Sequence, residues 1–439
     1  MSLFGAMNTA ISGLSAQSDA FGNISDNVAN SQTVGFKRID TNFVDYLTTS
    51  TATTNNPGAV VARPDYVNDV QGTITQTDNP LALAVTGQGF FAVSQQVGSV
   101  NNVPTFSPQQ FYSRAGDFQL NDTGYLVNSA GEYLNGWTVD PASGIVNQNL
   151  LAPIQVTQTV FNPVATSSVT MSANLPATPA TGTATAASPI SSDINVYDAL
   201  GTMHTVTLSW VQNSGNDWTV SLNAPDATTP SLGSADVKFG AVSGNPVPEG
   251  TVGQIGSATG TVTTSAYAPN TAATLDFTAD FGSGTQAIQL NLGNYGQTGG
   301  VTQYAGTTYN LRGLTQNGVP PGSFSGVTTQ TNGNIVVNYD NGQTRTIGQV
   351  PLITFNNPDA LQRQNGQSFT TTLDSGTPLA EAAGTNGAGS LVTKAIESSN
   401  VDIATEFSKL IVAQQAYSAN AKMVTTAQAM LTTTIDMKQ

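Results

Sequence analysis

Residues that could do chemistry are few in this sequence, and their spacing does not suggest a catalytic site. There is one histidine, His204, and no cysteine, so disulfides and thiolate metal sites are excluded. A histidine-based triad or metal cluster would depend on that single residue. His204 lies in an alternating run, Thr202 to Trp210, which is typical of a structural histidine on a β-strand.

The glycine motifs and carboxylate pairs also favour structure over catalysis. Gly87-Gln88-Gly89 lacks the third glycine and the helix of a dinucleotide-binding loop. Phe324 stands where a nucleophile elbow over 322–326 would need serine. Carboxylates such as Asp193 and Asp198 could act as an acid and a base, but their spacing does not place them in one cleft. We expect no catalytic residues, no cofactor and no metal.

Charge is sparse and mostly negative. Only 9% of the 439 residues are charged, and 12 basic against 27 acidic residues give a net charge of -15. Such a balance repels phosphate groups, so we expect protein partners and no nucleic acid. No apolar run reaches the roughly 18 residues of a membrane span, and residues 1–10 do not resemble a signal peptide. The protein is therefore expected not to insert in a membrane, and to be cytosolic or exported without a cleaved signal.

Apolar residues at the C-terminal end follow an unbroken 4-3 spacing. The positions are Ile403, Phe407, Leu410, Gln414, Tyr417, Ala421, Val424, Gln428, Leu431 and Ile435. A repeat of 3.5 residues keeps one stripe facing a neighbour along a helix, as in a coiled coil. Gln414 and Gln428 interrupt this stripe. Because polar residues in an apolar seam can fix helix register, we predict that role for them.

The N-terminal segment carries a matching stripe. Its residues are Phe4, Met7, Ile11, Leu14, Phe21 and Val28. Three glycines in this segment each lower helix propensity by about 1 kcal/mol, so the helix should need a partner to become ordered. The stripe at the other end of the chain is the predicted partner. We expect residues 1–38 and 385–439 to form a coiled-coil-like assembly domain that also contacts other copies.

Between the two ends the sequence predicts many short β-strands. Apolar or alternating runs separated by turn residues fill 70–139 and again 193–281, with a low-complexity stretch between them. After Gly282 the style of the first block returns. We predict a multi-domain α+β fold with two mainly antiparallel β domains, the outer one inserted in the inner. The predicted parts are connecting segments at 39–72 and 360–384, a first β domain at 73–150 and 285–359, and an inserted domain at 151–284.

A family resemblance begins where the N-terminal helix should end. Residues 27–37 read Asn-Val-Ala-Asn-Ser-Gln-Thr-Val-Gly-Phe-Lys and resemble a segment shared by bacterial flagellar rod, hook and hook-associated axial proteins. The matching positions are Asn27, Ala29, Asn30, Thr33, Gly35, Phe36 and Lys37. Further similar segments follow in the family's order at 83–93, 112–118, 124–127, 399–402 and 413–421. Gln415 departs from the pattern at a position that is commonly arginine.

The resemblance implies a structural subunit. Residues 195–218 are similar to the inserted outer domain of the hook members, which favours hook over rod. Such a subunit would polymerise head to tail into a curved tube that acts as a universal joint between rod and filament. The implied partners are other copies, rod and hook-filament junction proteins, the hook cap and the flagellar type III export apparatus. The implied location is the extracellular flagellum, reached without a cleaved signal peptide.

Two other interpretations stay open at this point. A flagellar rod or hook-associated junction protein would share the terminal helices but would build a short, fixed layer. An extracellular β-rich adhesin or hydrolase would need no terminal heptads and would fold completely as a monomer.

Overall fold

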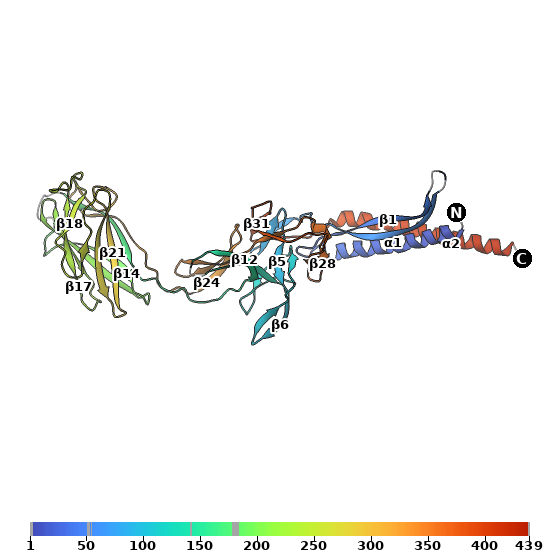
Figure 1. Cartoon of the computed structure of the whole chain (residues 1–439), viewed down its shortest axis with the longest axis horizontal. Helices are drawn as coiled ribbons and strands as arrows, with labels where there is room; N and C mark the ends of the chain where they lie inside the picture. Colours follow the sequence, from blue (N-terminus) through green and yellow to red (C-terminus); the bar gives the residue numbers. More distant parts are fainter. Residues whose placement is uncertain (1–2, 51–52, 54, 141–142, 178–183, 438–439) are drawn as a thin grey trace. The chain divides into compact units, whose positions relative to one another are not determined.

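The computed structural model describes residues 3–50, 53, 55–140, 143–177 and 184–437 and divides into two compact units (Figure 1). The first unit comprises Met1–Gln158, Ser325–Asn338 and Thr344–Gln439, and the second comprises Thr159–Phe324 and Tyr339–Gln343. Because the second unit is made from an internal part of the sequence, the first unit contains both chain ends.

The division between the units differs from the boundaries predicted from the sequence. Residues 285–324 lie in the second unit, although the sequence placed them in the first β domain. The reason is that β21 (Thr285–Asn294) and β23 (Asn310–Gln316) both hydrogen-bond to β13 (Ser168–Pro176), a strand of the second unit. Composition alone does not show which sheet a strand will join.

Two long helices bring the chain ends together in the first unit. α1 (Leu3–Ala29) and α2 (Ile403–Asp436) pack side by side and antiparallel, so that the N- and C-terminal ends lie at the same end of the pair in Figure 1. The Asp402 side chain caps α2 by accepting a hydrogen bond from the N–H of Thr405 at 2.8 Å. No helix in the described ranges has the length and apolar character needed to cross a membrane.

A long hairpin lies along α1. β1 (Ile39–Ser50) and β2 (Asn55–Tyr66) pair antiparallel, and the hydroxyl of Ser12 on α1 accepts a hydrogen bond from the N–H of Val60 at 3.1 Å. The segment 39–72, expected to be a connector, is therefore mostly a hairpin. Its polar and apolar residues follow no strict alternation, and the helix covers one face, which a local pattern does not reveal.

The β part of the first unit is built around one large sheet. The sheet has the strand order β24-β25-β26-β11-β5-β8-β29-β28, with β12 and β10 also paired to β11, and β9 paired to β10. Its strands are β5 (Phe91–Ser94), β8 (Phe111–Ser113), β9 (Gln119–Leu120), β10 (Leu126–Val127), β11 (Tyr133–Val139), β12 (Val146–Pro153), β24 (Phe324–Thr329), β25 (Asn334–Tyr339), β26 (Thr344–Gln349), β28 (Gln362–Arg363) and β29 (Ser368–Thr370).

Four two-stranded sheets and a short 3-10 helix, η1 (Pro358–Ala360), complete the first unit. The pairs are β3 (Ile74–Gln76) with β32 (Ala395–Glu397), β4 (Leu83–Thr86) with β31 (Ser390–Thr393), β6 (Gln96–Val100) with β7 (Val103–Phe106), and β27 (Leu352–Thr354) with β30 (Leu379–Glu381). Two of these pairs, β3 with β32 and β4 with β31, join a strand from early in the sequence to one just before α2. They position the start of that helix.

The second unit is a sandwich of two sheets. One has the order β19-β20-β21-β13-β22 with β23 beside β13, and the other has the order β14-β15-β16-β17-β18. The strands not yet given are β14 (Ile190–Tyr197), β15 (Met203–Ser214), β16 (Asp217–Asn223), β17 (Ser231–Phe239), β18 (Val252–Gly256), β19 (Thr263–Thr264), β20 (Ala272–Asp280) and β22 (Thr302–Tyr304).

Inward-facing side chains of both sheets form one apolar cluster that includes Trp210, Trp218 and Phe277. Along β15 and β16, buried residues alternate with more exposed ones, as expected for strands with one face on the core. β13 runs parallel to β21 and β22, whereas the pairs within the other sheet are antiparallel. The predicted α+β class with terminal helices and mainly antiparallel sheets is confirmed.

Candidate functional site

The contact between α1 and α2 is made mostly by small side chains. The buried residues of α1 are Ala10, Gly13, Ala16, Ala20, Ile24 and Asn27, and those of α2 are Glu406, Ala413 and Ala427. A Cβ atom added to Gly13 would lie 2.8 Å from Nδ2 of Asn420, so glycine is what allows the helices to approach here. The two helices are therefore in close contact along a narrow face.

The large apolar residues predicted to form the α1 stripe lie beside this face. Phe4 and Ile11 are 64% and 47% exposed, and Met7, Leu14, Phe21 and Val28 are only partly buried. The buried face is offset from the predicted stripe by one residue, about 100° around the helix. Within the chain, the predicted stripe lies beside the main contact with α2, although Phe21 still reaches Tyr417 of the α2 stripe. The prediction was based on hydrophobicity and therefore chose the largest apolar residues. In the structure, the two helices pack closely through alanine and glycine.

The α2 stripe is only partly used within the chain. Leu410, Val424 and Leu431 are half-buried, and Tyr417 packs edge-on against Phe21 with ring centroids 6.3 Å apart. The apolar positions nearer the helix ends face outward. These are Ile403, Phe407 and Ile435.

Gln414 and Gln428 are exposed, each one position after a buried alanine. They lie outside the contact between the two helices of one chain. Their predicted role in fixing helix register therefore stays a prediction about contacts with other copies.

Asn27, the first residue of the family-like segment, ties three elements together. Its amide is fully buried, and it exchanges two hydrogen bonds of 2.8 Å with the backbone N–H and carbonyl of Ile39 at the start of β1. It also donates to Oε2 of Glu406 on α2 at 3.1 Å. No shorter or longer side chain would offer the same donor and acceptor to both partners. Asn27 thus fixes the end of α1 against β1 and α2.

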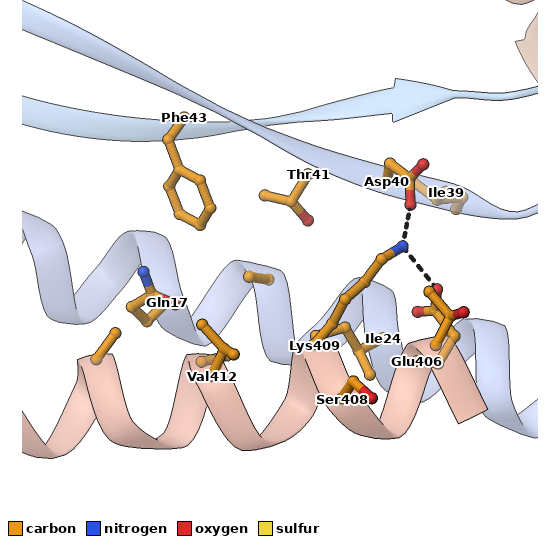
Figure 2. A pocket seen from close by; sticks show the side chains of 14 residues that line it. Gln17, Ile24, Ile39, Asp40, Thr41, Phe43, Glu406, Ser408, Lys409 and Val412 are labelled. Carbon is orange, nitrogen blue, oxygen red and sulfur yellow. Dashed lines mark hydrogen bonds and ion pairs between the residues drawn. The ribbon is translucent and has the colours of Figure 1, made fainter. Parts of the chain in front are cut away.

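Lys409 extends this network across the surface of α2. Its Nζ donates to Oε1 of the buried Glu406 at 2.7 Å and to Oδ1 of Asp40 on β1 at 2.5 Å (Figure 2). Burial alone would lower the pKa of Lys409, but its hydrogen bonds to the two carboxylates outweigh burial and raise that pKa. The lysine therefore stays charged and joins the hairpin to α2.

The turn after α1 is shaped by Asn30, Thr33 and Gly35. Nδ2 of Asn30 donates to the carbonyl of Asp26 at 2.9 Å, and the hydroxyl of Thr33 donates to Oδ1 of Asn30 at 3.2 Å. Gly35 has a φ of 71°, and an added Cβ would lie 2.4 Å from the backbone nitrogen of Ala115. Glycine is therefore required here both by conformation and by the close approach of a second segment.

The last residues of the segment differ in their surroundings. Phe36 is buried under the guanidinium of Arg363, which lies 4.3 Å from the ring centroid. Arg363 also donates to the carbonyl of Lys37 at 2.7 Å. Ala29 is exposed, and nothing in the structure explains its place in the segment.

Lys37 belongs to a buried charge cluster centred on Glu397. Nζ of Lys37 lies 2.6 Å from Oε1 of Glu397, and Nη1 of Arg114 lies 3.1 Å from Oε2, with all three side chains at most 2% exposed. The N–H of Gly72 also donates to Oε1 at 2.8 Å, and Nη2 of Arg114 donates to the carbonyl of Gly87 at 2.8 Å. Burial lowers the pKa values of Lys37 and Arg114, and the negative charge of Glu397 opposes this shift.

This charge cluster locks the helical end of the first unit to its β part. Lys37 follows the turn after α1, Arg114 follows β8 and Glu397 ends β32, so three distant segments meet at one carboxylate. Sequence reasoning found Lys37 but missed Glu397 as a site residue. No local signal marks Glu397, because its two cationic partners, Lys37 and Arg114, lie far away in the sequence.

A groove lies between α1, α2 and the start of the hairpin. Its volume is about 530 Å³, and Figure 2 shows it flanked by β1 on one side and by the helices on the other. It is lined by Gln17, Ala20, Ile24, Ile39, Asp40, Thr41, Phe43, Thr405, Glu406, Ser408, Lys409, Val412, Ala413 and Ala416. Apart from the Asp40–Lys409–Glu406 link at one end, the lining is mostly apolar or small.

His204, in the second unit, has structural contacts. Its Nδ1 lies 2.5 Å from Oδ2 of Asp226, and its ring stacks on Phe281 with centroids 4.0 Å apart. Burial would raise the pKa of Asp198, whose Oδ2 is 3.6 Å from Nε2 of His204, but hydrogen bonds led by the N–H of Thr202 hold it below its usual range. The histidine therefore joins two loops of the sandwich. Within the described residues, no three His, Cys, Asp or Glu side chains are grouped as a metal site.

Comparison with known proteins finds flagellar rod and hook families along the chain. Sequence families match as follows: Flagella basal body rod protein at residues 7–37, Flagellar hook protein FlgE/F/G D1 domain at 84–174, Flagellar basal body protein FlaE D2 domain at 162–319, and Flagellar basal body rod FlgEFG protein C-terminal at 392–437. The Flagellar hook protein FlgE of Brucella abortus is 30% identical over 100% of both chains.

Other relatives are similar over nearly the same length. The Flagellar hook protein FlgE of Salmonella typhimurium is 30% identical over 99% of this chain and 100% of its own. Among solved structures, the flagellar hook protein FlgE2 of Helicobacter pylori covers 74% of this chain and 100% of its own, with a TM-score of 0.48 and 13% identity.

Proposed function

The chain belongs to the flagellar hook protein family, and from this premise we propose that it polymerises head to tail into a curved helical tube. In that tube each copy contributes to a flexible joint between the flagellar rod and the filament. A head-to-tail contact whose rotation does not close generates an open helical polymer, which is the geometry a tube requires.

One observation supports the proposal most strongly: the terminal helices contact each other through small residues and leave large apolar ones outside. Phe4, Ile11 and Phe407 are each about half exposed or more. Exposed apolar surface on this scale marks sites of protein contact. We propose that the predicted stripe residues on both helices pack against other copies, in a coiled-coil-like inner wall.

The β-rich units provide the second half of the proposed mechanism. As the tube bends, their surfaces slide against neighbouring copies while the helical wall holds the subunits together. Only 9% of the residues are charged, whereas Thr, Asn and Gln are abundant, so few strong ion pairs would oppose sliding. Hydrogen bonds lost in such a movement are replaced by water at small net cost.

The proposed partners follow from the position of a hook in the flagellum. They are rod proteins at one end of the tube, hook-filament junction proteins at the other and the hook cap during growth. We propose that the flagellar type III apparatus exports the chain to the extracellular flagellum without a cleaved signal peptide.

The proposal is tested by removing residues 1–30 or residues 400–439 and imaging the purified proteins by electron microscopy. The full-length chain is expected to form curved tubes, and each truncated chain is expected to form none. Tubes from either truncated chain would contradict the role given to the helices. Short rigid rings from the full-length chain would favour a rod or junction protein, and a full-length chain that stays monomeric at high concentration would favour an adhesin.

A further inference from the structure

The groove described above, here called the helix-hairpin groove, is accessible from outside. Two of its apolar lining residues, Phe43 on β1 and Val412 on α2, are 47% and 65% exposed. Its floor contains the small residue Ala20 and the buried Ile24 of α1. A site of about 530 Å³ lies in the roughly 300–1,000 Å³ range of pockets that enclose ligands, so it can hold the side chains of one helical turn.

The end of α2, here called the α2 tail (430–437), extends beyond the described part of α1. Gly13 lies against Asn420, so Leu3, at the described start of α1, lies opposite about Met430 in this antiparallel pair. The helix then continues to Asp436. Within the described residues, α1 does not extend far enough to cover the tail.

The α2 tail presents methionines on one face. Met430 and Met437 are 57% and 84% exposed, and Met423, seven residues earlier, is also exposed. Residues seven apart lie about 20° apart around a helix, so all three point the same way. Methionine is flexible and polarisable, which lets it fill irregular apolar surfaces.

We propose that the α2 tail of one copy docks into the helix-hairpin groove of another copy. This proposal rests on the proposed polymerisation and names one of its contacts. A chain cannot fill its own groove, because Val412 lies on α2 and Met437 directly follows the end of this continuous helix, 25 residues or about 37 Å further on. Each copy therefore has one free tail and one free groove, at different levels of the same helix.

This pairing is heterologous, which agrees with head-to-tail growth. The tail and the groove are different surfaces, so binding one leaves the other available to the next copy. The methionine contact also suits a joint that bends, since methionine side chains can repack without losing apolar contact. At the groove end, Lys409 pairs with both Asp40 and Glu406, and Arg38 pairs with Asp40, so these charges already have partners within the chain and the apolar part is what remains to be covered.

Cysteine cross-linking tests the contact directly, because the natural chain has no cysteine. Val412→Cys/Met437→Cys is assembled into tubes and oxidised. We expect a ladder of dimers, trimers and longer chains on a non-reducing gel. The control is Ser418→Cys/Met437→Cys, in which Ser418 is exposed on α2 but lies outside both the groove and the predicted stripe, and it is expected to give no ladder.

The outcomes separate this proposal from the proposed function. Tubes of Val412→Cys/Met437→Cys that do not cross-link would overturn the docking contact, as would a ladder in the control. A second variant, Val412→Cys/Ile11→Cys, tests the alternative occupant. A ladder from this variant and none from Val412→Cys/Met437→Cys would show that α1 of a neighbour fills the groove and would overturn the proposal. If the wild-type chain forms no tubes, the proposed function itself fails.

A charge variant gives a second, independent test. Met430→Glu/Met437→Glu places two carboxylates on the docking face and is expected to abolish tubes while leaving the circular dichroism of the monomer unchanged. Thr425→Glu/Thr432→Glu adds the same charges, also seven residues apart, on another exposed face of α2 and is expected to retain tubes. Equal assembly by the two variants would contradict the proposal.

Discussion

The core of the second unit and the junction in the first unit are built from different chemistry. Between the two sheets of the second unit, the buried cluster is apolar and includes Trp210, Trp218 and Leu222. At the junction, the fully buried groups are the amide of Asn27 and the charges gathered around Glu397. The sandwich encloses its own core, whereas the helical end of the first unit is fixed by a few directed contacts.

The apolar core of the second unit therefore provides stability, whereas the polar junction of the first unit positions the helices for assembly. Apolar burial is roughly proportional to area and does not depend on direction, so a sandwich can be stable without neighbours. Buried charges cost desolvation energy and add little net stability, but they destabilise strongly when one partner is removed. The junction thus defines where the helices lie, and their exposed apolar faces remain available to other copies.

The largest expected effect comes from Glu397→Gln. The change leaves Lys37 and Arg114 buried without their counter-charge, and we expect the first unit to lose about 3–5 kcal/mol of unfolding free energy. Chemical denaturation followed by circular dichroism measures the loss. Glu381→Gln is the matched control, because that carboxylate accepts a surface hydrogen bond from Asn386. Equal stability of the two variants would show that the cluster does not form the lock.

Leu222→Ala tests the other side of the comparison. Leu222 is 1% exposed in the sandwich, so its truncation is expected to cost about 2–5 kcal/mol in the second unit. Tryptophan fluorescence in a Trp137→Phe background reports this unit, since Trp210 and Trp218 lie in its core and the third tryptophan, Trp137, lies in the first unit. The stability of the first unit should not change. A loss shared by both units would mean that they are not separate cores.

Two glycines of α1 should respond in opposite directions. Gly22→Ala has free space around the new methyl group and is expected to stabilise the helix by about 0.5–1 kcal/mol. Gly13→Ala gains the same propensity but presses on Asn420, so its net stability should be lower than that of Gly22→Ala. Thermal unfolding compares the two. The idea of close helix contact fails if Gly13→Ala is the more stable variant.

The smallest expected effect concerns the cap of α2 at low pH. The N–H of Thr405 is the main cause of the lowered pKa of Asp402, so the folded state favours its carboxylate. This contribution is present above the ordinary pKa of aspartate and is lost as the pH falls below about 4. Asp402→Asn keeps a capping side chain without a titrating group. Helicity measured against pH should therefore fall more in the wild type than in Asp402→Asn.

Much of the fold class was predictable because it depends on local patterns. Alternating residues indicated the strands, and the helical spacing indicated both terminal helices. The hairpin at 39–66 was not predicted, because its polar strands are stabilised by packing along α1, and a sequence pattern does not show that contact. The assignment of 285–324 failed for a similar reason, since strand pairing between distant segments decides it.

The candidate site was predictable where a residue has a local role. Asn27 and Gly35 stood out in the family-like segment, and the structure gives each a contact that its residue type alone provides. Glu397 was missed because its importance depends on Lys37 and Arg114, which are far away in sequence. The buried faces of the helices were missed because alanine and glycine contribute little to a hydrophobicity pattern, although they allow the closest packing.

The sequence separation within the charge cluster has a consequence for the order of folding. Glu397 lies 360 residues after Lys37 and 283 after Arg114. Contacts between such distant residues form late, because closing so large a loop costs chain entropy before any contact is gained. In a chain whose N-terminal end is the first to become free to fold, Lys37 and Arg114 must therefore stay unpaired until Glu397, in the last tenth of the sequence, becomes available. The first unit can therefore be completed only after nearly all of the sequence is free to fold.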